Sequence, residues 1–574
     1  MRTRSKRLGG LVAIAAASVL VISACGTSGG GDKQQSSPGF AACEEKPNEC
    51  NNGPTKPGGS IVVALEKTIP NFNVLDSEGN VFEAGQIMNG VTLTPYVNQP
   101  DSSVKWNKNW LAEEPKLTST SPQTVQYKIR NEAVWDDGTP VSAKDFSLNW
   151  KSLNGKDCPK CTPASSSGYE LITAVTGSDN DKTVTVTFDK PYPDWKGLFQ
   201  LFPAHVAAKQ GDIATPEGLE KAWEFFKGKP DWSGGPYKVS EYVQDVSVTL
   251  VPNPKWYGTK TSLDKITFRI VTDQAQQLPA MQNKEVQVLV SQPNKDMVDK
   301  VKGMAGVNFV LAKGPTWEHI DINTKNAALA DVALRQAIFT ATNRQEVIDK
   351  TVGSYFPSAA PLNNHIFMPG APGYKDVVTA TGQGKGDVEA AKKILTTAGY
   401  KIENNKLIGK DGQPVPAFRF RYTAGNQGRQ QSAELFQAQM AKIGVEIKIE
   451  PTSSLGNTTT NGDYDIIIFA WVGTPFVGDS VSIWTTGGGQ NYGKYSNPQV
   501  DALMKEAAQT LDETKMRDLF NQADEIMAKE AYVLPLYQKP VFLAVYGDYI
   551  NIRNNPTNVG PTYNMEEWGL KADS

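Results

Sequence analysis

The chain has 574 residues, too many for one ordinary hydrophobic core, and its 39% hydrophobic and 21% charged residues are typical of a globular protein. Its 58 basic and 61 acidic residues give a formal net charge of -3. This balance provides no basic surface for phosphate groups, so we expect no nucleic-acid partner.

Residues 1–24 are predicted to be a signal peptide. Four basic residues precede an apolar run over 8–22, which is too short and too rich in small residues for a spanning helix. The run ends in the sequence ISAC, whose last residue is Cys25, and this is the lipobox pattern of bacterial lipoproteins. We expect cleavage before Cys25 and its acylation, which would hold the protein at the outer face of the cytoplasmic membrane. The alternative is an ordinary secretory signal with an incidental cysteine.

Residues 25–57 are predicted to be the lipidated cysteine and a flexible linker. The segment consists largely of Gly, Ser, Asn, Lys and Pro, with few apolar positions that could bury a core. Loss of the leader removes four basic residues and no acid, so the mature chain is more acidic than the precursor. The acyl chains, and not a basic surface, would therefore bind the membrane.

Four more cysteines are present, and an export signal places them in an oxidising compartment. Their spacing favours two local disulfides, Cys43 with Cys50 and Cys158 with Cys161. Two alternatives remain: a thioredoxin-like redox pair in the CPKC motif, which needs a strand-to-helix context, and a four-cysteine zinc site. The Asn, Gly, Lys, Pro and Ser residues around the CPKC motif indicate an exposed loop and favour the disulfides.

Strand and helix patterns alternate from residue 58 onward, which indicates an α/β architecture. The apolar run over 61–65 predicts a strand buried on both faces. Further strands are predicted over 125–130, 183–188, 246–251 and 266–271. Helices are predicted from a Ser142 cap onward, and over 332–352, 387–398, 429–443, 497–511 and 512–531.

Several sequence stretches resemble, in the same order, the signature segments of one protein family. They are RNEAVWDDGTPVSAKDFSLNW at 130–150, GGPYKV at 234–239, NPKWY at 253–257, the INT, RQA and NR motifs within 322–344, YDIIIFAW at 464–471 and LPLY at 534–537. The family is the oligopeptide/dipeptide class of ABC-transporter solute-binding proteins, also called family 5. The resemblance covers roughly residues 58–560.

This resemblance implies a two-lobed fold of the periplasmic-binding-protein type II kind, which closes on a ligand by hinge bending. The expected parts are lobe I over 58–95, 233–313 and 534–574, an inserted subdomain over 96–232, and lobe II over 314–533. Two crossings between the lobes, near Gly314-Pro315 and near Val533-Leu534, would form the hinge.

The resemblance also implies a ligand site at the end of the strand over 465–471. In the family, the peptide lies extended in the cleft, and an Asp three residues after the Trp takes its α-amino group. Here the sequence reads Trp471-Val472-Gly473-Thr474, so Thr474 replaces that Asp. A buried ammonium without its counter-charge costs about 3 to 5 kcal/mol. Three interpretations remain: Asp479 supplies the carboxylate, the ligand's amine is blocked or differently placed, or the ligand is not a peptide.

Three further residues are candidates for ligand contact: Trp484 and Trp317, as aromatic lining, and His365, in an Asn-Asn-His loop. We assign Phe476 to core packing and His319 to a structural role. The three histidines show no metal-binding spacing, and no nucleotide, nucleophile-elbow or zinc-protease motif is present.

We therefore predict a solute-binding lipoprotein of an ABC importer, not an enzyme, without metal or cofactor. Its expected partners are a peptide or other small solute, the ABC permease subunits, and the membrane through its lipid anchor, and we expect a monomer. The alternative is a protein of the same fold that binds cell-envelope glycans or glycolipids and has no transport role.

Overall fold

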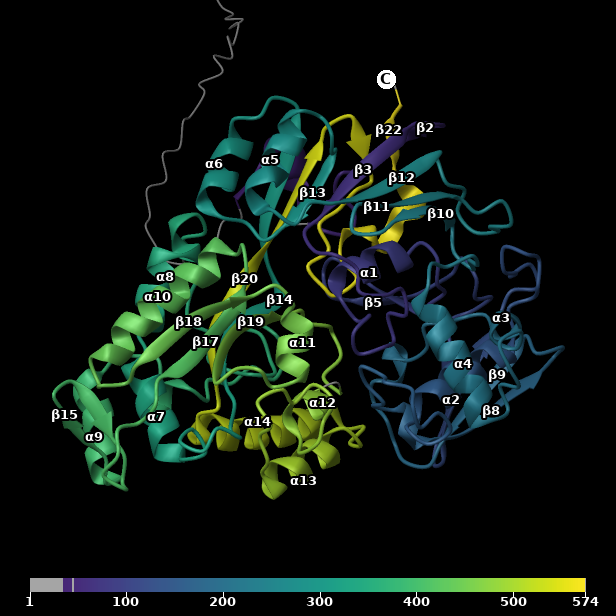
Figure 1. Cartoon of the computed structure of the whole chain (residues 1–574). Helices are drawn as coiled ribbons and strands as arrows, with labels where there is room; N and C mark the ends of the chain where they lie inside the picture. The colour runs from purple at the N-terminus through teal and green to yellow at the C-terminus, as the bar shows by residue number, and fades with distance from the viewer. Residues whose placement is uncertain (1–34, 44–45, 479, 573–574) are drawn as a thin grey trace, which may run out of the picture. The chain divides into compact units, whose positions relative to one another are not determined.

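The computed structural model describes residues 35–43, 46–478 and 480–572, and the chain from residue 34 onward forms one compact unit (Figure 1). Its centre is an 11-stranded mixed sheet. In spatial order, its strands are β10 (Tyr237–Val243), β11 (Ser247–Pro252), β12 (Lys265–Ile270), β3 (Ser60–Leu65), β13 (Val288–Ser291), β20 (Val533–Tyr546), β14 (Val307–Ile322), β19 (Ile466–Trp471), β17 (Phe418–Thr423) and β18 (Ile447–Thr452), with β1 (Gln35–Ser36) paired to β14.

The smaller sheets lie outside this central one. They are the four-stranded sheet β6 (Lys116–Thr120), β7 (Gln123–Lys128), β9 (Thr183–Phe188) and β8 (Ile172–Ser178); the three-stranded sheet β2 (Thr55–Lys56), β22 (Gly569–Lys571) and β21 (Tyr549–Ile550); and the hairpins β4 (Tyr96–Asn98) with β5 (Val104–Trp106) and β15 (Lys401–Glu403) with β16 (Lys406–Ile408). The four-stranded sheet belongs to the predicted inserted subdomain, where α2, α3 and α4 gather beside it (Figure 1).

The described helices alternate with these strands, as the sequence predicts. They are α1 (Phe82–Met88), α2 (Ala143–Leu153), α3 (Ala204–Ala207), α4 (Pro216–Lys227), α5 (Gln274–Gln282), α6 (Lys295–Lys302), α7 (Val332–Ala341), α8 (Arg344–Lys350), α9 (Val388–Thr397), α10 (Gln427–Ala441), α11 (Leu455–Thr460), α12 (Ser480–Trp484), α13 (Pro498–Ala507) and α14 (Glu513–Glu530). The predicted α/β fold is confirmed.

Side-chain caps explain many of the helix starts. Ser142 and Asp145 form a capping box on α2, and Asp512 caps α14. The prediction of one long helix over 332–352 is wrong, because Asn343 caps a second helix there by accepting a hydrogen bond from the N–H of Glu346. Both α7 and α8 bury apolar residues, so the periodic apolar pattern continues across the break between them.

Strands β14 and β20 are the longest in the sheet, and they pair in two stretches. Val307–Lys313 pairs with Pro540–Tyr546, and Trp317–Asp321 pairs with Val533–Gln538. Between the stretches, Gly314 and Pro315 lie opposite Lys539. In this register the position opposite the expected crossing at Gly314-Pro315 is Lys539, whereas Val533-Leu534 pairs with Ile320-Asp321. That two crossings form a hinge stays a prediction.

The large hydrophobic cores follow the faces of the central sheet more than the predicted domain boundaries. One core joins residues of the predicted lobe I and the predicted inserted subdomain, such as Ile61, Trp110, Trp135 and Trp568. Another includes residues of α5 and α6 and continues into the predicted lobe II. A third core lies around α13 and α14. The shared cores follow from the continuity of β14 and β20.

The described part of residues 25–57 is packed, in contrast to the predicted flexible linker. β1 pairs with β14, and Phe40 is 1% exposed in the first core. Arg553 donates a hydrogen bond to the carbonyl of Cys50 at 2.8 Å. We call the described residues 35–43 and 46–57 the N-terminal strap. A composition poor in apolar residues concealed this packing, which depends on few buried side chains and on pairing with distant strands. The expected acylation site, Cys25, lies outside the described residues.

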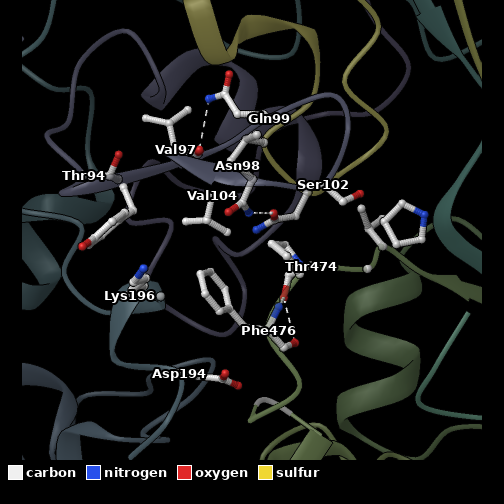
Figure 2. Close-up of a pocket in the computed structure, with 18 of the residues that line it drawn as sticks. Thr94, Val97, Asn98, Gln99, Ser102, Val104, Asp194, Lys196, Thr474 and Phe476 are labelled. Carbon is white, nitrogen blue, oxygen red and sulfur yellow. Dashed lines mark hydrogen bonds between the residues drawn. The ribbon is translucent and has the colours of Figure 1, made fainter. Parts of the chain in front are cut away.

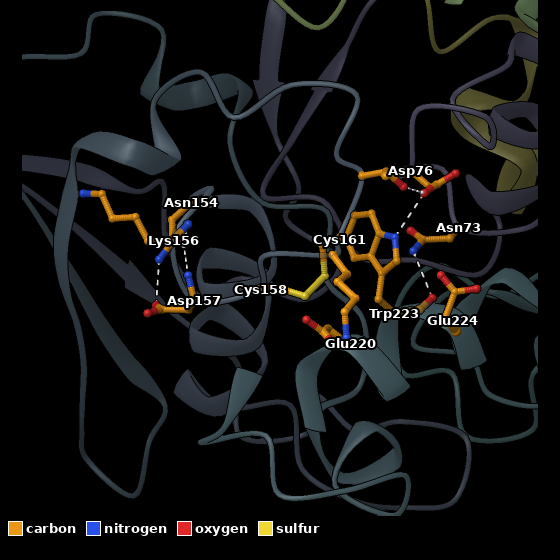
Figure 3. The surroundings of a disulfide bond; sticks show 12 residues. Asn73, Asp76, Asn154, Lys156, Asp157, Cys158, Cys161, Glu220, Trp223 and Glu224 are labelled. Carbon is orange, nitrogen blue, oxygen red and sulfur yellow. Dashed lines mark hydrogen bonds and ion pairs between the residues drawn. A yellow bond between two sulfur atoms is a disulfide. The ribbon is translucent and has the colours of Figure 1, made fainter. Parts of the chain in front are cut away.

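Two disulfides are present, with the pairing that the spacing favours. Cys43 is bonded to Cys50 within the strap, and Cys158 is bonded to Cys161 in a loop (Figure 3). Near the second bond, Trp223 donates a hydrogen bond to the buried carboxylate of Asp76 at 3.0 Å (Figure 3). Lys160, between the two cysteines, forms an ion pair with Glu220 at 2.9 Å.

Candidate functional site

A cavity of about 1880 Å³ lies between segments that are far apart in the sequence. One side is formed by the β4–β5 hairpin and residues 192–200, and the other by residues 365–372 and 470–477. Pro315 of β14 and Gln538 of β20 line it as well, and we call these two strands the crossing strands. The volume exceeds the 300 to 1,000 Å³ that is usual for drug-sized ligands. The cavity therefore has room for an oligomeric ligand.

Seven of the eight predicted ligand-contact residues line this cavity. They are Trp317, His365, Trp471, Val472, Gly473, Thr474 and Trp484. The eighth, Asp479, lies outside the described residues.

Trp471 ends β19 and is half-buried at the cavity. Its indole stacks on Tyr492 at 5.7 Å between ring centroids and on His319 at 5.9 Å, each with an interplanar angle of 12°. After it, Val472 is 40% exposed, the most open apolar side chain of this segment. The strand end thus presents an aromatic edge and an aliphatic side chain to any bound molecule.

Gly473 is required by its close approach to the backbone of Pro315 on β14. A Cβ at this position would lie 2.4 Å from the carbonyl oxygen of Pro315. On its other side, the carbonyl of Gly473 accepts a hydrogen bond from the N–H of Asn558 at 3.2 Å. The segment after β19 therefore contacts both β14 and the C-terminal part of the chain.

Thr474 uses its hydroxyl within its own turn. The oxygen accepts a hydrogen bond from the N–H of Phe476 and donates one to the carbonyl of Phe476, each at 3.0 Å (Figure 2). The single hydroxyl proton is thereby used, and the position carries no charge. Thr474 thus stabilises the turn and provides no counter-charge for a ligand ammonium.

The assignment of Phe476 to core packing is wrong. Its half-buried ring points into the cavity (Figure 2), and a Cβ at Gly197 on the opposite wall would lie 3.0 Å from its Cδ2 atom. Two residues on, the N–H of Gly478 donates a hydrogen bond to the carboxylate of Asp194 at 2.5 Å. The two walls are in direct contact here. Because phenylalanine occurs both in hydrophobic cores and on cavity walls, its residue type does not tell which of the two applies. No other signal in the sequence marks Phe476.

Trp317, Trp484 and His365 form an inner layer of the wall. Trp317 is 4% and Trp484 2% exposed, and the two rings lie 6.4 Å apart. His365 is buried against Asp524, with Nδ1 2.5 Å from Oδ1. Burial opposes protonation, but the charge of Asp524 raises the pKa of His365 above its usual value. Trp317 and Trp484 belong to the core cluster against which the more exposed Trp471 packs, and His365 contacts both of their rings.

His319 has the buried setting that a structural role requires. Its Nδ1 atom lies 2.6 Å from the carboxylate of Asp321, and its ring packs 4.6 Å from that of Trp317. Through these contacts it fixes the aromatic residues behind the cavity.

Amide side chains on the β4–β5 hairpin form a part of the wall that the sequence did not reveal. Asn98 donates a hydrogen bond to Asn558 at 2.9 Å, and Gln99 donates one to the carbonyl of Val97 at 3.1 Å (Figure 2). The polar Asn-Gln-Pro-Asp stretch at 98–101 was the only signal of a tight turn here. Amides of this kind both donate and accept hydrogen bonds, as a ligand main chain or hydroxyl requires.

The charges on the described wall are balanced, with six basic and six acidic side chains. Some are paired with each other, such as Arg517 with Glu513 at 2.5 Å and Arg553 with Glu567 at 2.7 Å. Burial raises the pKa of Glu566 to about 7. No described group of three or more His, Cys, Asp or Glu side chains is arranged to hold a metal ion. The wall therefore favours recognition by hydrogen bonds and apolar contact.

The family model described as "Bacterial extracellular solute-binding proteins, family 5 Middle" matches residues 108–493 of the chain. The chain belongs to this family. Family 5 consists of solute-binding proteins, so the protein is not an enzyme. Among the described residues of this family-5 protein, no helix has both the length and the apolar character needed to cross a membrane.

Three proteins of known name or structure are similar to this family-5 member. The oligopeptide-binding protein OppA of Mycobacterium tuberculosis is 33% identical over 504 residues, which cover 86% of this chain and 82% of that protein. The structure of the periplasmic EDTA-binding protein EppA is 34% identical and has a TM-score of 0.86, covering 92% of this chain and 99% of that one. The structure of AppA from Bacillus subtilis with a nonapeptide has a TM-score of 0.79 at 21% identity, covering 90% and 100%, and supports the fold alone.

Proposed function

We propose that the protein is the lipid-anchored receptor of an ABC importer and captures peptides or peptide-like solutes in its cavity. The observation that carries the proposal is the cavity of about 1880 Å³, enclosed by walls from both sides of the two crossing strands. Such a space suits an extended oligomer, and the similarity to OppA supports a peptide. Acyl chains on Cys25 would hold this receptor, as a monomer, beside its permease.

Ligand capture would proceed by hinge bending at Gly314-Pro315 and Lys539, between lobe I with its inserted subdomain and lobe II. The contact between Asp194 and Gly478 would then be made on closure. Hydrogen bonds from wall amides would bind the ligand main chain regardless of its sequence, while Trp471, Val472 and Phe476 would pack against its side chains.

A second candidate is a protein that binds glycans or glycolipids of the cell envelope and has no transport role. Two observations favour it: the uncharged, internally bonded Thr474, and the aromatic edge of Trp471 beside Tyr492, which could contact a sugar ring.

A thermal-shift experiment separates these candidates. The purified protein would be melted with pools of free peptides of two to nine residues, the same peptides acetylated, cell-wall oligosaccharides, and EDTA, which is included because of the similarity to EppA. Since a ligand at 100 times its Kd adds about 2.7 kcal/mol, a peptide ligand should raise Tm by several degrees. If no peptide pool shifts Tm and an oligosaccharide does, the peptide proposal is wrong.

The anchor has its own test. Cys25→Ala should move the protein from the membrane fraction to the soluble fraction, and the mass of the wild-type N-terminal peptide should include acyl chains. An unmodified Cys25 in a membrane-free protein would contradict the anchor.

A further inference from the structure

A network of buried charged and amide side chains lies at the hinge, beside the two crossing strands. Glu318 of β14 is 1% exposed, and its Oε1 accepts a hydrogen bond from Nε of Arg429 on α10 at 2.6 Å. The ammonium of Lys539 lies 3.2 Å from the other carboxylate oxygen. Burial lowers the pKa of Lys539 to about 8, against the attraction of Glu318.

Gln292, which follows β13, links this cluster to lobe I. Its side-chain oxygen accepts hydrogen bonds from the Lys539 ammonium and, at 2.8 Å, from Asn426, the residue that caps α10 in lobe II. Its side-chain nitrogen donates to Glu66, at the end of β3, at 2.8 Å. One amide therefore contacts lobe I, the crossing strand and lobe II at once.

These side chains do not belong to the ligand wall. Among the described lining residues, β14 and β20 contribute Lys313, Gly314, Pro315, Trp317 and Gln538. Glu318 and Lys539, which directly follow Trp317 and Gln538, are absent from the lining. Neighbouring residues on a strand point to opposite faces. The network thus occupies the face of the hinge away from the cavity.

Burial of this many ionised groups is not an efficient source of stability, because desolvation offsets most of their attraction. Their hydrogen bonds are, however, directional and weaken steeply once the angle at the hydrogen falls below about 120°. The network is formed in a conformation in which the cavity walls touch, through Gly478 and Asp194. Bending at Gly314 and Lys539 would change the separation of Gln292 from Asn426.

We propose that Lys539, Gln292 and Asn426 are positioning residues that stabilise the closed arrangement of the two lobes from the back of the hinge. They would set how much of the ligand-free protein is closed and thus tune ligand affinity without touching the ligand. This inference rests on the proposed capture by hinge bending, but on no particular ligand.

The test measures the distance between the lobes directly. Spin labels would be attached at Glu217→Cys on α4 and Glu389→Cys on α9, whose side chains are 77% and 84% exposed, in the mature chain with Cys25→Ser. Double electron–electron resonance without ligand gives the open and closed populations. Lys539→Met should raise the open-to-closed ratio at least threefold.

The matched control is Lys238→Met, which removes a part-buried ion pair with Asp136 at 2.5 Å outside the hinge. It should leave the distance distribution unchanged. If Lys539→Met fails to fold, Asn426→Ser decides: serine keeps the cap on α10 but is too short to reach Gln292, and should raise the ratio at least twofold.

Distance distributions of the folded variants that superimpose on the wild type would overturn the proposal, as would an equal shift in Lys238→Met. Since no ligand is added, a failure to bind peptides would leave this measurement intact. The inference and the proposed function can therefore fail separately.

Discussion

Phe476 on one wall of the cavity packs against the backbone of Gly197 on the other. A Cβ at Gly197 would lie 3.0 Å from Cδ2 of the ring, and the same two segments are joined by the hydrogen bond from Gly478 to Asp194. A Cβ at 197 would force the ring to move by a few tenths of an ångström, and a larger side chain would force it further, whereas the backbone of Gly197 is not in the left-handed region.

Gly197→Leu should therefore prevent full contact of the walls. We expect ligand dissociation to become at least tenfold faster with little change in Tm, because the new side chain meets a half-buried ring and not a core. Stopped-flow displacement of a bound fluorescent ligand measures this rate. Gly456→Leu on α11, where nothing lies within 4 Å of the new Cβ, is the control and should dissociate at the wild-type rate. Equal rates in both variants would show that the contact plays no part in retention.

Trp471→Ala should weaken ligand binding at least tenfold and lower stability by about 2 kcal/mol, less than the 3 to 5 kcal/mol of a fully buried tryptophan, because the indole is half-exposed. Isothermal titration and urea unfolding measure the two effects. Trp568→Ala, at a fully buried position that does not line the cavity, should show the reverse pattern. If Trp471→Ala instead unfolds the protein, Trp471 belongs to the core and the site assignment is wrong.

Thr474→Asp would restore a carboxylate while keeping the oxygen that accepts the N–H of Phe476. If the ligand is a peptide with its amine near this turn, the variant should bind free peptides about fivefold more tightly than acetylated ones, since a partly exposed ion pair contributes about 1 kcal/mol. Thr474→Asn, of the same shape but uncharged, is the control. A competition assay with paired free and acetylated peptides gives the ratio. No preference in the aspartate variant would place the ligand amine elsewhere.

Stability should fall on acidification below pH 4.5 because of Glu318. Burial alone would raise its pKa, but the attraction of Arg429 and Lys539 outweighs burial and lowers the pKa to about 2. The unfolded chain therefore takes up the proton first, and stability present above pH 4.5 is lost as the pH falls towards 2, by about 3 kcal/mol. Urea unfolding between pH 5 and 2.5 measures this slope. Glu318→Gln should flatten it and lower stability at pH 7, because Arg429 loses its charged partner. An unchanged slope in this variant would assign the acid sensitivity to other carboxylates.

Removal of the disulfide in the N-terminal strap should cost about 2 kcal/mol, since it closes a short loop of the unfolded chain. In Cys43→Ser with Cys50→Ser, limited proteolysis should cut the strap well before the rest of the protein. Cys158→Ser with Cys161→Ser, which opens a loop elsewhere, should leave the strap resistant. Equal cleavage of the strap in the two variants would show that the bond does not hold it.

Local sequence signals predicted the elements well, and long-range contacts account for the misses. The Ser142 capping box and the alternating run over 183–188 are encoded by neighbours, and both appear where expected. Phe476 and Gly197 meet over a sequence separation of 279 residues, and Lys539 and Gln292 over one of 247 residues. No periodicity or motif in a single sequence carries such pairings.

The packed strap also shortens the stretch of chain between the expected lipid anchor and the folded part of the protein. Only ten peptide units separate Cys25 from Gln35, where β1 begins, and at full stretch they reach about 35 Å. A free segment up to residue 57 would have reached about three times as far. An acylated Cys25 would thus keep the start of β1 within about 35 Å of the membrane surface, which limits how far the receptor could move from its permease.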